Sequence, residues 1–268
     1  MKNCKVLILV LAGNTYRSNS NLKTQTNTWM KHVNHDVKII SYKGGGKENF
    51  KGNVLQVNVN DKYQNISEKT LEAFKWINRN YNFDYLFRTN TSSYVDLKNL
   101  ENFCDLNQNK FLYRGRRLEN VFNQKSISWV SGAEILLSKD TFNILVDNFD
   151  TWDISLPDDV AIGSILQNKK VLISESKSLL FSPSFFHLRK FEHEYHFRCR
   201  VDSPYYYPRT LDKVLMYYIN SELYSLSISA LKRTLMKGLF LCSKIFAFQK
   251  HKYYLSFYFW KYIKKVFQ

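Results

Sequence analysis

The sequence predicts an α/β fold built on a mostly parallel sheet, and three observations support this prediction. Short apolar runs alternate with segments of helical periodicity over the first two thirds of the chain. The runs are continuous rather than interrupted by polar residues, which is typical of strands covered by helices on both faces. The chain has 268 residues, of which 44% are hydrophobic, so it can bury a large core and is not disordered as a whole.

The expected elements follow one another in a strand–helix order. We expect strands over 4–12 and 37–40, a strand carrying Val54, Val57 and Val59, and helices near 23–33 and over 66–79. Further along we expect strands at Tyr85–Phe87 and Trp129–Leu137, and then a helix that carries Phe142, Leu145 and Val146. Ligands of such sheets bind beyond the carboxyl ends of the strands, so the loops after residues 12, 43 and 87 are where a site is expected.

Two features of the chain bear on its location. The apolar run Val6–Ala12 after Lys2 and Lys5 resembles a signal peptide, but no cleavage pattern follows it and a buried strand explains it better. No stretch reaches the ~18–20 apolar residues of a membrane span, and the four cysteines show no paired spacing. We therefore expect a cytoplasmic protein without a disulfide framework.

The charge is strongly positive and unevenly distributed. The net charge is +16, and residues 209–268 hold eleven Lys/Arg against Asp212 and Glu222, which leaves +9 there. A domain boundary is therefore expected between 1–205 and a basic, aromatic helical region over 206–268. Basic residues beside aromatic ones suit a helix on an anionic membrane surface. A helix packed on the domain is the alternative, and no motif supports binding to nucleic acid.

Three segments contain residues that could do chemistry. Leu156–Gly163 places the adjacent carboxylates Asp158 and Asp159 at an expected helix start, where they either stabilise the helix dipole or supply a general base. Trp129–Ser138 carries Gly132, which is either a bulge in a strand or a point where a ligand approaches the backbone. Phe83–Asp96 leads an apolar strand into small polar residues, which either cap the next helix or contact a phosphate.

These three segments, in this order, resemble the fringe and β-1,3-galactosyltransferase-like glycosyltransferases. The strongest similarity is Leu156-Pro157-Asp158-Asp159-Val160-Ala161-Ile162-Gly163, and Thr28-Trp29 and Phe186-His187 add to it. The resemblance covers roughly residues 4–200. It implies a GT-A-like fold, with a nucleotide-sugar-binding mixed sheet flanked by helices.

The metal motif of those families is altered here. They hold a divalent ion with an Asp-x-Asp cluster, but the matching positions are Asn90, Thr91 and Ser92. Neutral oxygens bind Mg²⁺ or Mn²⁺ poorly, so the resemblance implies either a metal-independent enzyme or a shifted site at Asp96 and His187. Without a metal, cationic side chains would have to face the leaving diphosphate, and the candidates are Arg17, Lys23, Arg88, Arg189 and Lys190.

The resemblance also implies the roles of the remaining candidates. Asp159, or failing it Asp158, would be the base of an inverting sugar transfer. The donor, expected to be a UDP-sugar, would contact Ala12, Gly13, Asn14, Arg17, Arg88, Asn90 and Ser92. Gly132, Ala133 and Glu134 would face the acceptor, a glycan or a lipid-linked precursor of a bacterial capsule or lipopolysaccharide at the inner face of the membrane. The alternative is a non-catalytic protein that binds glycans or polyanions on the same fold.

Overall fold

The computed structural model describes residues 1–122, 125–176, 179–180, 194–199 and 210–224. Its α-helices are α1 (Tyr16–Asn27), α2 (Ile66–Asn80), α3 (Leu97–Leu106), α4 (Lys139–Val146), α5 (Asp158–Asn168) and α6 (Thr210–Leu223). Its strands are β1 (Lys2–Leu11), β2 (Val37–Gly44), β3 (Asn49–Lys51), β4 (Val54–Val57), β5 (Tyr81–Asn90), β6 (Ser93–Val95), β7 (Tyr113–Gly115), β8 (Arg117–Phe122), β9 (Lys125–Val130), β10 (Ile135–Ser138), β11 (Ile173–Glu175), β12 (Leu179–Leu180) and β13 (His196–Arg198). Short 3-10 helices are η1 (Trp29–His32), η2 (Tyr63–Asn65) and η3 (Phe149–Thr151).

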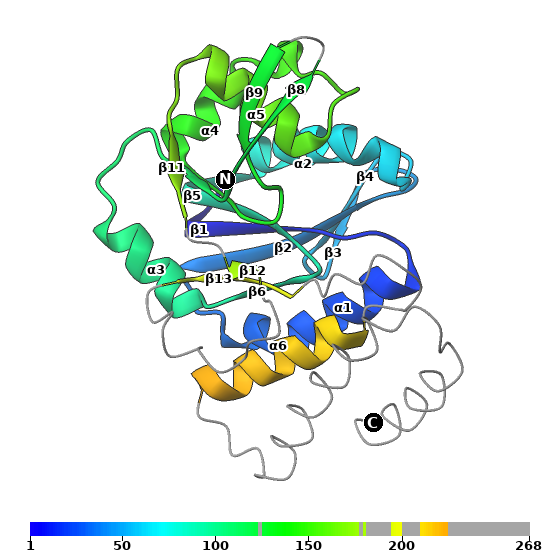
Figure 1. The fold of residues 1–268 in the computed structure, drawn as a ribbon. Helices are drawn as coiled ribbons and strands as arrows, with labels where there is room; N and C mark the ends of the chain where they lie inside the picture. Colours follow the sequence, from blue (N-terminus) through cyan, green and yellow to red (C-terminus); the bar gives the residue numbers. More distant parts are fainter. Residues whose placement is uncertain (123–124, 177–178, 181–193, 200–209, 225–268) are drawn as a thin grey trace, which may run out of the picture.

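A large mixed sheet forms the centre of the fold, in the order β11-β7-β10-β5-β1-β2-β4-β3. Strands β5, β1, β2 and β4 are parallel to one another, whereas β10 is antiparallel to both of its neighbours. Helices α2, α4 and α5 cover one face of the sheet, and α1, α3 and α6 cover the other (Figure 1). The α/β prediction is therefore confirmed, in a form consistent with a GT-A-like fold.

The apolar run of β1 is continuous because each face of the strand packs into a different core. Leu7 and Leu9 belong to the core under α2, α4 and α5, whereas Val6, Ile8 and Val10 belong to the core on the opposite face. Alternate side chains of a strand point to opposite faces, so a strand buried on both sides needs apolar residues at every position. This confirms that the N-terminal run is a buried strand.

Two expected elements are wrong in their boundaries. The helix near 23–33 begins earlier, at Tyr16, where Thr15 caps it by accepting a hydrogen bond from the Ser18 amide at 3.2 Å. It ends before Thr28, whose backbone leaves the helical region, and η1 follows. Thr28 therefore stands at the break between α1 and η1, and Trp29 begins η1 rather than lying inside the α-helix.

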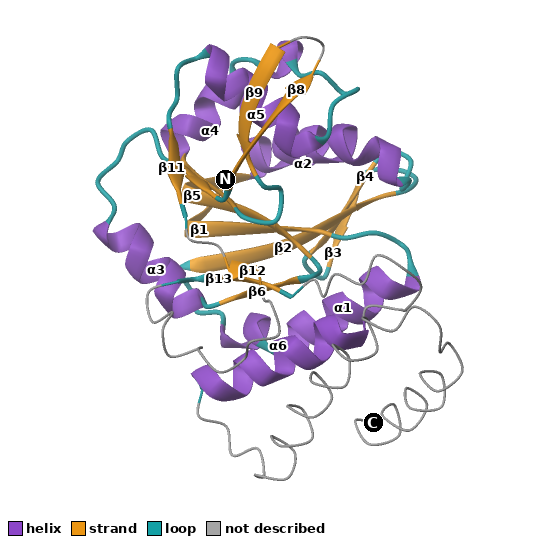
Figure 2. Cartoon of the chain, viewed as in Figure 1, coloured by secondary structure: helices purple, strands orange, loops and turns teal. Residues whose placement is uncertain are grey.

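The expected strand Trp129–Leu137 is two strands of different sheets. Residues up to Val130 belong to β9, which forms a hairpin with β8, whereas Ile135 begins β10 in the main sheet. Between them the chain turns, with the Glu134 amide donating to the Ser131 carbonyl at 2.9 Å. Figure 2 shows the β8–β9 hairpin beside α5, apart from the main sheet.

Helix α6 lies within the region 206–268 that the sequence sets apart as a basic appendage. Its side chains Val214, Leu215, Met216 and Ile219 are buried in the same core as one face of β1. The predicted domain boundary itself stays a prediction, and the tail beyond Tyr224 lies outside the described residues. Among the described residues, none of the helices has the length and apolar character needed to cross a membrane.

Candidate functional site

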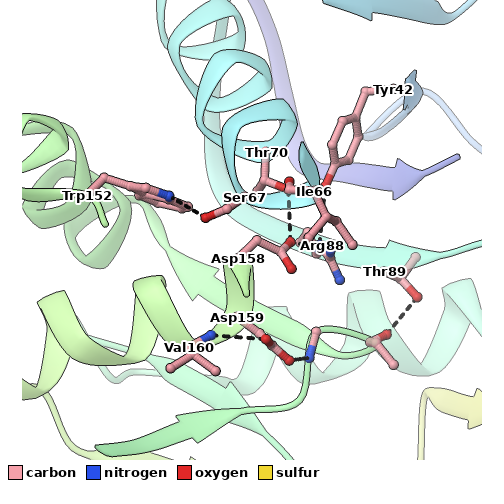
Figure 3. Close-up of polar contacts among 12 residues, drawn as sticks. Tyr42, Ile66, Ser67, Thr70, Arg88, Thr89, Trp152, Asp158, Asp159 and Val160 are labelled. Carbon is pink, nitrogen blue, oxygen red and sulfur yellow. Dashed lines mark hydrogen bonds and ion pairs between the residues drawn. The ribbon is translucent and has the colours of Figure 1, made fainter. Parts of the chain in front are cut away.

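Most of the predicted site residues lie where strands of the main sheet end. Strands β1, β2 and β5 run parallel, so Ala12, the end of β2 and Asn90 share one edge of the sheet. Strand β10 is antiparallel to β5, with Ile135 opposite Arg88, so the turn before β10 reaches the same edge. Helix α5 presents its N-terminus there and brings Asp158 and Asp159 to this edge (Figure 3).

A closed ring of buried polar side chains holds Asp158. The Arg88 guanidinium pairs with its Oδ2 atom, to which the Thr70 hydroxyl also donates at 2.8 Å. Tyr42 completes the ring, because its hydroxyl lies 2.9 Å from Thr70 Oγ1 and accepts from Arg88 Nε at 3.3 Å. Four elements, β2, α2, β5 and α5, supply one member each. Asp158 is therefore held by structural partners and is poorly placed to take a proton from a substrate.

Arg88 was expected to face the donor diphosphate, but its charge is already paired. Its side chain is 2% exposed and is matched by Asp158, whose side chain is 4% exposed. Burial alone would lower the pKa of Arg88, but Asp158, Tyr42 and Asp159 together outweigh burial and raise it, so the guanidinium stays charged. A buried charge without its partner is strongly unfavourable. Arg88 is thus placed to fix the acid pair.

Asp159 has a different environment from its neighbour. It is half-buried, its Oδ2 accepts from the Gly132 amide at 2.8 Å, and its Oδ1 accepts from the Val160 amide at 3.0 Å (Figure 3). Burial and the charge of Asp158 raise the pKa of this carboxyl above its ordinary value, although Arg88 and the two amides oppose the shift. A partly accessible carboxylate with a raised pKa suits a general base.

The turn before β10 packs tightly against the acid pair. A Cβ on Gly132 would lie 2.7 Å from Arg88 Nη1 and 3.1 Å from Asp159 Oδ2, so any larger residue would displace one of them. The Ala133 carbonyl accepts from Thr89 Oγ1 at 2.7 Å, which ties the turn to β5. Gly132 thus lies beside the candidate base, and its place on the acceptor side stays a prediction.

Glu134, also predicted on the acceptor side, lies in the interior instead. It is 1% exposed, its Oε1 accepts from the Ser176 hydroxyl at 2.7 Å, and its Oε2 lies 3.5 Å from His196 Nδ1. His196 is also 1% exposed and reaches Ser93 Oγ at 3.0 Å. The sequence gives no signal for this pairing, because the two residues are far apart along the chain.

The loop after β1 is built around a residue that the sequence analysis missed. Asp61 accepts hydrogen bonds from the Asn14 amide, from the Gly44 amide at 3.0 Å and from Lys69 Nζ at 2.9 Å. Gly13 donates to Ser18 Oγ at 2.8 Å, whereas Arg17 is exposed at the start of α1. The sequence does contain a signal for this ion pair, since Asp61 and Lys69 have opposite charges and lie on either side of the start of α2. Helical periodicity alone, however, predicts that a lysine faces solvent.

The altered metal motif forms a turn that is closed by its own side chains. The Asn90 side-chain oxygen accepts from the Ser92 amide at 3.0 Å and from the Ser92 hydroxyl at 3.1 Å. Asp96 caps α3 by accepting from the Asn99 amide at 3.2 Å, and burial raises its pKa. His187, Arg189 and Lys190 lie outside the described residues.

These residues do not fit a divalent metal site. The one amide oxygen at the Asp-x-Asp positions is engaged within its turn, and the Ser92 hydroxyl donates to it rather than facing outward. The carboxylate oxygens that Mg²⁺ or Mn²⁺ would need are missing from these three positions. Within the described ranges, no group of three or more His, Cys, Asp or Glu side chains is arranged to hold a metal ion.

Comparison with known proteins gives a family match over part of the chain. Residues 46–125 match the family model described as Galactosyltransferase. Over this stretch the chain is similar to galactosyltransferases, which supports a glycosyltransferase enzyme. A search of curated proteins finds no match. The resemblance to β-1,3-galactosyltransferase-like proteins that the sequence predicts is therefore confirmed, and with it the prediction of an enzyme that takes a nucleotide-sugar donor and a glycan acceptor.

The match covers one side of the glycosyltransferase's candidate site. It spans Asp61, α2 with Lys69 and Thr70, all of β5 with Arg88, and the altered metal motif. The acid pair and Gly132 lie beyond residue 125, outside the matched stretch. Hydrogen bonds from Arg88 and Thr70 to Asp158 connect the two parts of this site.

Proposed function

We propose that this glycosyltransferase is an inverting enzyme that moves a sugar from a UDP-sugar to an acceptor hydroxyl, with Asp159 as the general base. The observation that carries the proposal is the contrast within the acid pair. Asp158 is held in the buried ring with Arg88, whereas Asp159 is half-buried and has a raised pKa. A partly accessible carboxylate whose pKa is raised, beside a second carboxylate that is held by structural partners, suits a general base.

The reaction proceeds as a single displacement. The acceptor oxygen attacks the anomeric carbon as its proton passes to the Asp159 carboxylate. The bond between that carbon and the diphosphate oxygen breaks, and the nucleoside diphosphate leaves with the electron pair from the opposite face. The Gly132 amide, 2.8 Å from Asp159 Oδ2, orients the carboxylate during the transfer.

We further propose that no divalent metal takes part. The Asn90–Ser92 turn offers no carboxylate, and its amide oxygen is engaged internally. The charge of the leaving diphosphate then needs cationic partners, for which the exposed Arg17 and Lys23 of α1 are the described candidates. EDTA in the assay is expected to leave turnover unchanged, and a complete loss that Mn²⁺ restores would overturn this part.

The acceptor we propose is a lipid-linked precursor of a bacterial surface polysaccharide, such as capsule or lipopolysaccharide, at the cytoplasmic face of the membrane. The support for it comes from the sequence. Residues 209–268 hold eleven Lys/Arg against two acids, and Tyr253–Trp260 is rich in aromatic residues. Such a composition favours an anionic membrane surface, which would bring the enzyme to a lipid-borne acceptor.

A donor panel tests the proposed transfer. The full chain is incubated with UDP-, GDP-, dTDP- and CMP-sugars together with lipid-linked oligosaccharides, and nucleotide release is measured. We expect acceptor-dependent release of UDP, and NMR of the product should show an anomeric configuration opposite to that of the donor. Retention of configuration would refute the inverting mechanism. Binding of a nucleotide sugar with no release from any donor would favour the non-catalytic alternative.

A further inference from the structure

The Asp61 carboxylate connects four segments near the expected donor site: the loop after β1, the end of β2, helix α2 and the segment after β4 that carries Asp61 itself. Its Oδ2 accepts from the Asn14 amide in the loop after β1, and its Oδ1 accepts from Gly44 at the end of β2 and from Lys69 in α2. Asp61 itself follows β4. One side chain therefore sets the spacing between the carboxyl ends of three neighbouring parallel strands, where an α/β sheet binds its ligand.

The surrounding backbone leaves little freedom for this arrangement to change. A Cβ on Gly44 would lie 2.5 Å from the Val59 carbonyl oxygen and 3.0 Å from the Asp61 Cα atom. Asn14 adds a second link, since its side-chain amide donates to the Gly44 carbonyl at 3.1 Å. The β1 loop and the end of β2 are thus attached both to Asp61 and to each other.

Lys69 is the charge that keeps Asp61 ionised in this position. The Lys69 side chain is 5% exposed and that of Asp61 is 11% exposed, so neither charge is well solvated. Burial alone would raise the pKa of Asp61, but the hydrogen bonds from Lys69 and from the Asn14 and Gly44 amides outweigh burial and lower it. Asp61 therefore accepts from all three donors as a carboxylate at neutral pH.

We infer that Asp61 and Lys69 are positioning residues that hold the β1 and β2 loops in the shape that binds the nucleoside diphosphate of the donor. The inference rests on the proposed function, a transfer from a UDP-sugar donor, together with the sequence-based expectation that the loops after residues 12 and 43 bind that donor. Asp61 acts through Asn14 and Gly44, because its oxygens are already occupied by protein donors. Its loss should weaken binding of different nucleotides alike.

The test measures UDP and GDP binding to the full chain by calorimetry, in the wild type and in Asp61→Asn. The introduced amide has one acceptor oxygen, and its NH₂ group would face a donor, so the loops lose their spacing. We expect UDP to bind about tenfold to a hundredfold more weakly, because small misplacements in a site have effects of this size. The acceptor KM should stay near its wild-type value.

A double variant separates positioning from folding. Asp61→Asn alone leaves the buried Lys69 unpaired and should also lower the melting temperature. Asp61→Asn/Lys69→Met removes that unpaired charge, so the melting temperature should recover while UDP binding stays weak. The matched control is Arg79→Gln, which removes the exposed Arg79–Glu48 pair of the same helix and should change neither quantity.

Three results would overturn the inference. The first is unchanged UDP affinity in Asp61→Asn, and the second is full recovery of UDP binding in the double variant, which would assign Asp61 a folding role only. The third is a loss confined to UDP while GDP binding is unchanged, which would make Asp61 a direct base contact. If the wild type itself binds no nucleotide of a wider panel, the proposed function is wrong. Failure of the proposed function is thereby distinguished from failure of this inference, which requires a wild type that binds UDP.

Discussion

Asp158 and Asp159 are chemically identical neighbours, yet the first turn of α5 gives them different surroundings. Successive helical residues point about 100° apart, so Asp158 turns inward to Arg88 and Thr70 while Asp159 turns toward Gly132. The sequence predicts an acid pair at a helix start, and this is confirmed. It could not decide between the two carboxylates, because the partners that separate them lie 70 and 88 residues away.

The raised pKa of Asp159 predicts the pH dependence of the reaction. A general base acts when deprotonated, so kcat/KM should fall as the pH drops through the folded-state pKa, which lies above the ordinary 3.8. Asp158→Asn removes a like charge and leaves Arg88 facing Asp159 alone, so the acidic limb should move to lower pH. The measurement is the pH profile of kcat/KM for both proteins.

Asp158→Asn also breaks the buried ion pair with Arg88, so the pH profile of kcat/KM must be measured under conditions in which the variant is folded. Losing one partner of such a pair destabilises by about 3–5 kcal/mol, which circular dichroism at the assay temperature would monitor. An acidic limb that stays in place, or that moves to higher pH, would show that Asp159 does not control it.

At the scale of elements, α5 carries the candidate base in its first turn, and the β8–β9 hairpin packs against α5. The Gln167 side chain of α5 pairs with the β9 backbone, accepting from the Ser128 amide at 2.8 Å and donating to the Ser126 carbonyl at 3.0 Å. The sequence predicts α5 but merges the end of β9 with β10, because Trp129-Val130 and Ile135–Leu137 are apolar and the turn between them lacks proline. The division appears in the strand pairing, since Trp129 pairs with Leu118 of β8 whereas Ile135 pairs with Arg88 of β5.

Gly163 of α5 packs closely against Trp129 and Ser128 of β9, so it gives a test of this contact. A Cβ there would overlap the Trp129 Cβ and lie 3.0 Å from the Ser128 carbonyl oxygen. Gly163→Ala should therefore destabilise by about 1–3 kcal/mol through overpacking, despite the better helix propensity of alanine. Urea unfolding measures it, with Ser164→Ala as the control that should lose no stability. Equal stability of Gly163→Ala and wild type would contradict the close contact.

At the scale of the whole molecule, the packing of α6 determines where the basic tail can be removed without disturbing the core. Helix α6 is part of the second core, so deleting residues 209–268 would remove Val214, Leu215, Met216 and Ile219 from it. Residues 225–268 hold nine Lys/Arg and no Asp or Glu, so they carry the whole +9 of the region after residue 208. The charge gradient could be read from the sequence, but the role of α6 could not, because it depends on packing against α1 and β6.

A chain truncated after Tyr224 tests the proposed membrane surface. We expect it to fold and to bind UDP as the full chain does, but to lose sedimentation with vesicles of anionic lipid, because each basic residue near such a surface contributes about 1 kcal/mol. Vesicles of neutral lipid are the control, and added salt should release the full chain. Equal sedimentation of the two chains with anionic vesicles would refute a membrane role for the tail.

The turnover of Asp159→Asn tests the central claim most directly. The substituted side chain keeps an oxygen that can accept from the Gly132 amide but cannot take up the acceptor proton. With the donor that the panel identifies, kcat should fall about 10²–10⁴-fold while UDP affinity stays at its wild-type value. Wild-type kcat in this variant would contradict the assignment of Asp159 as the base.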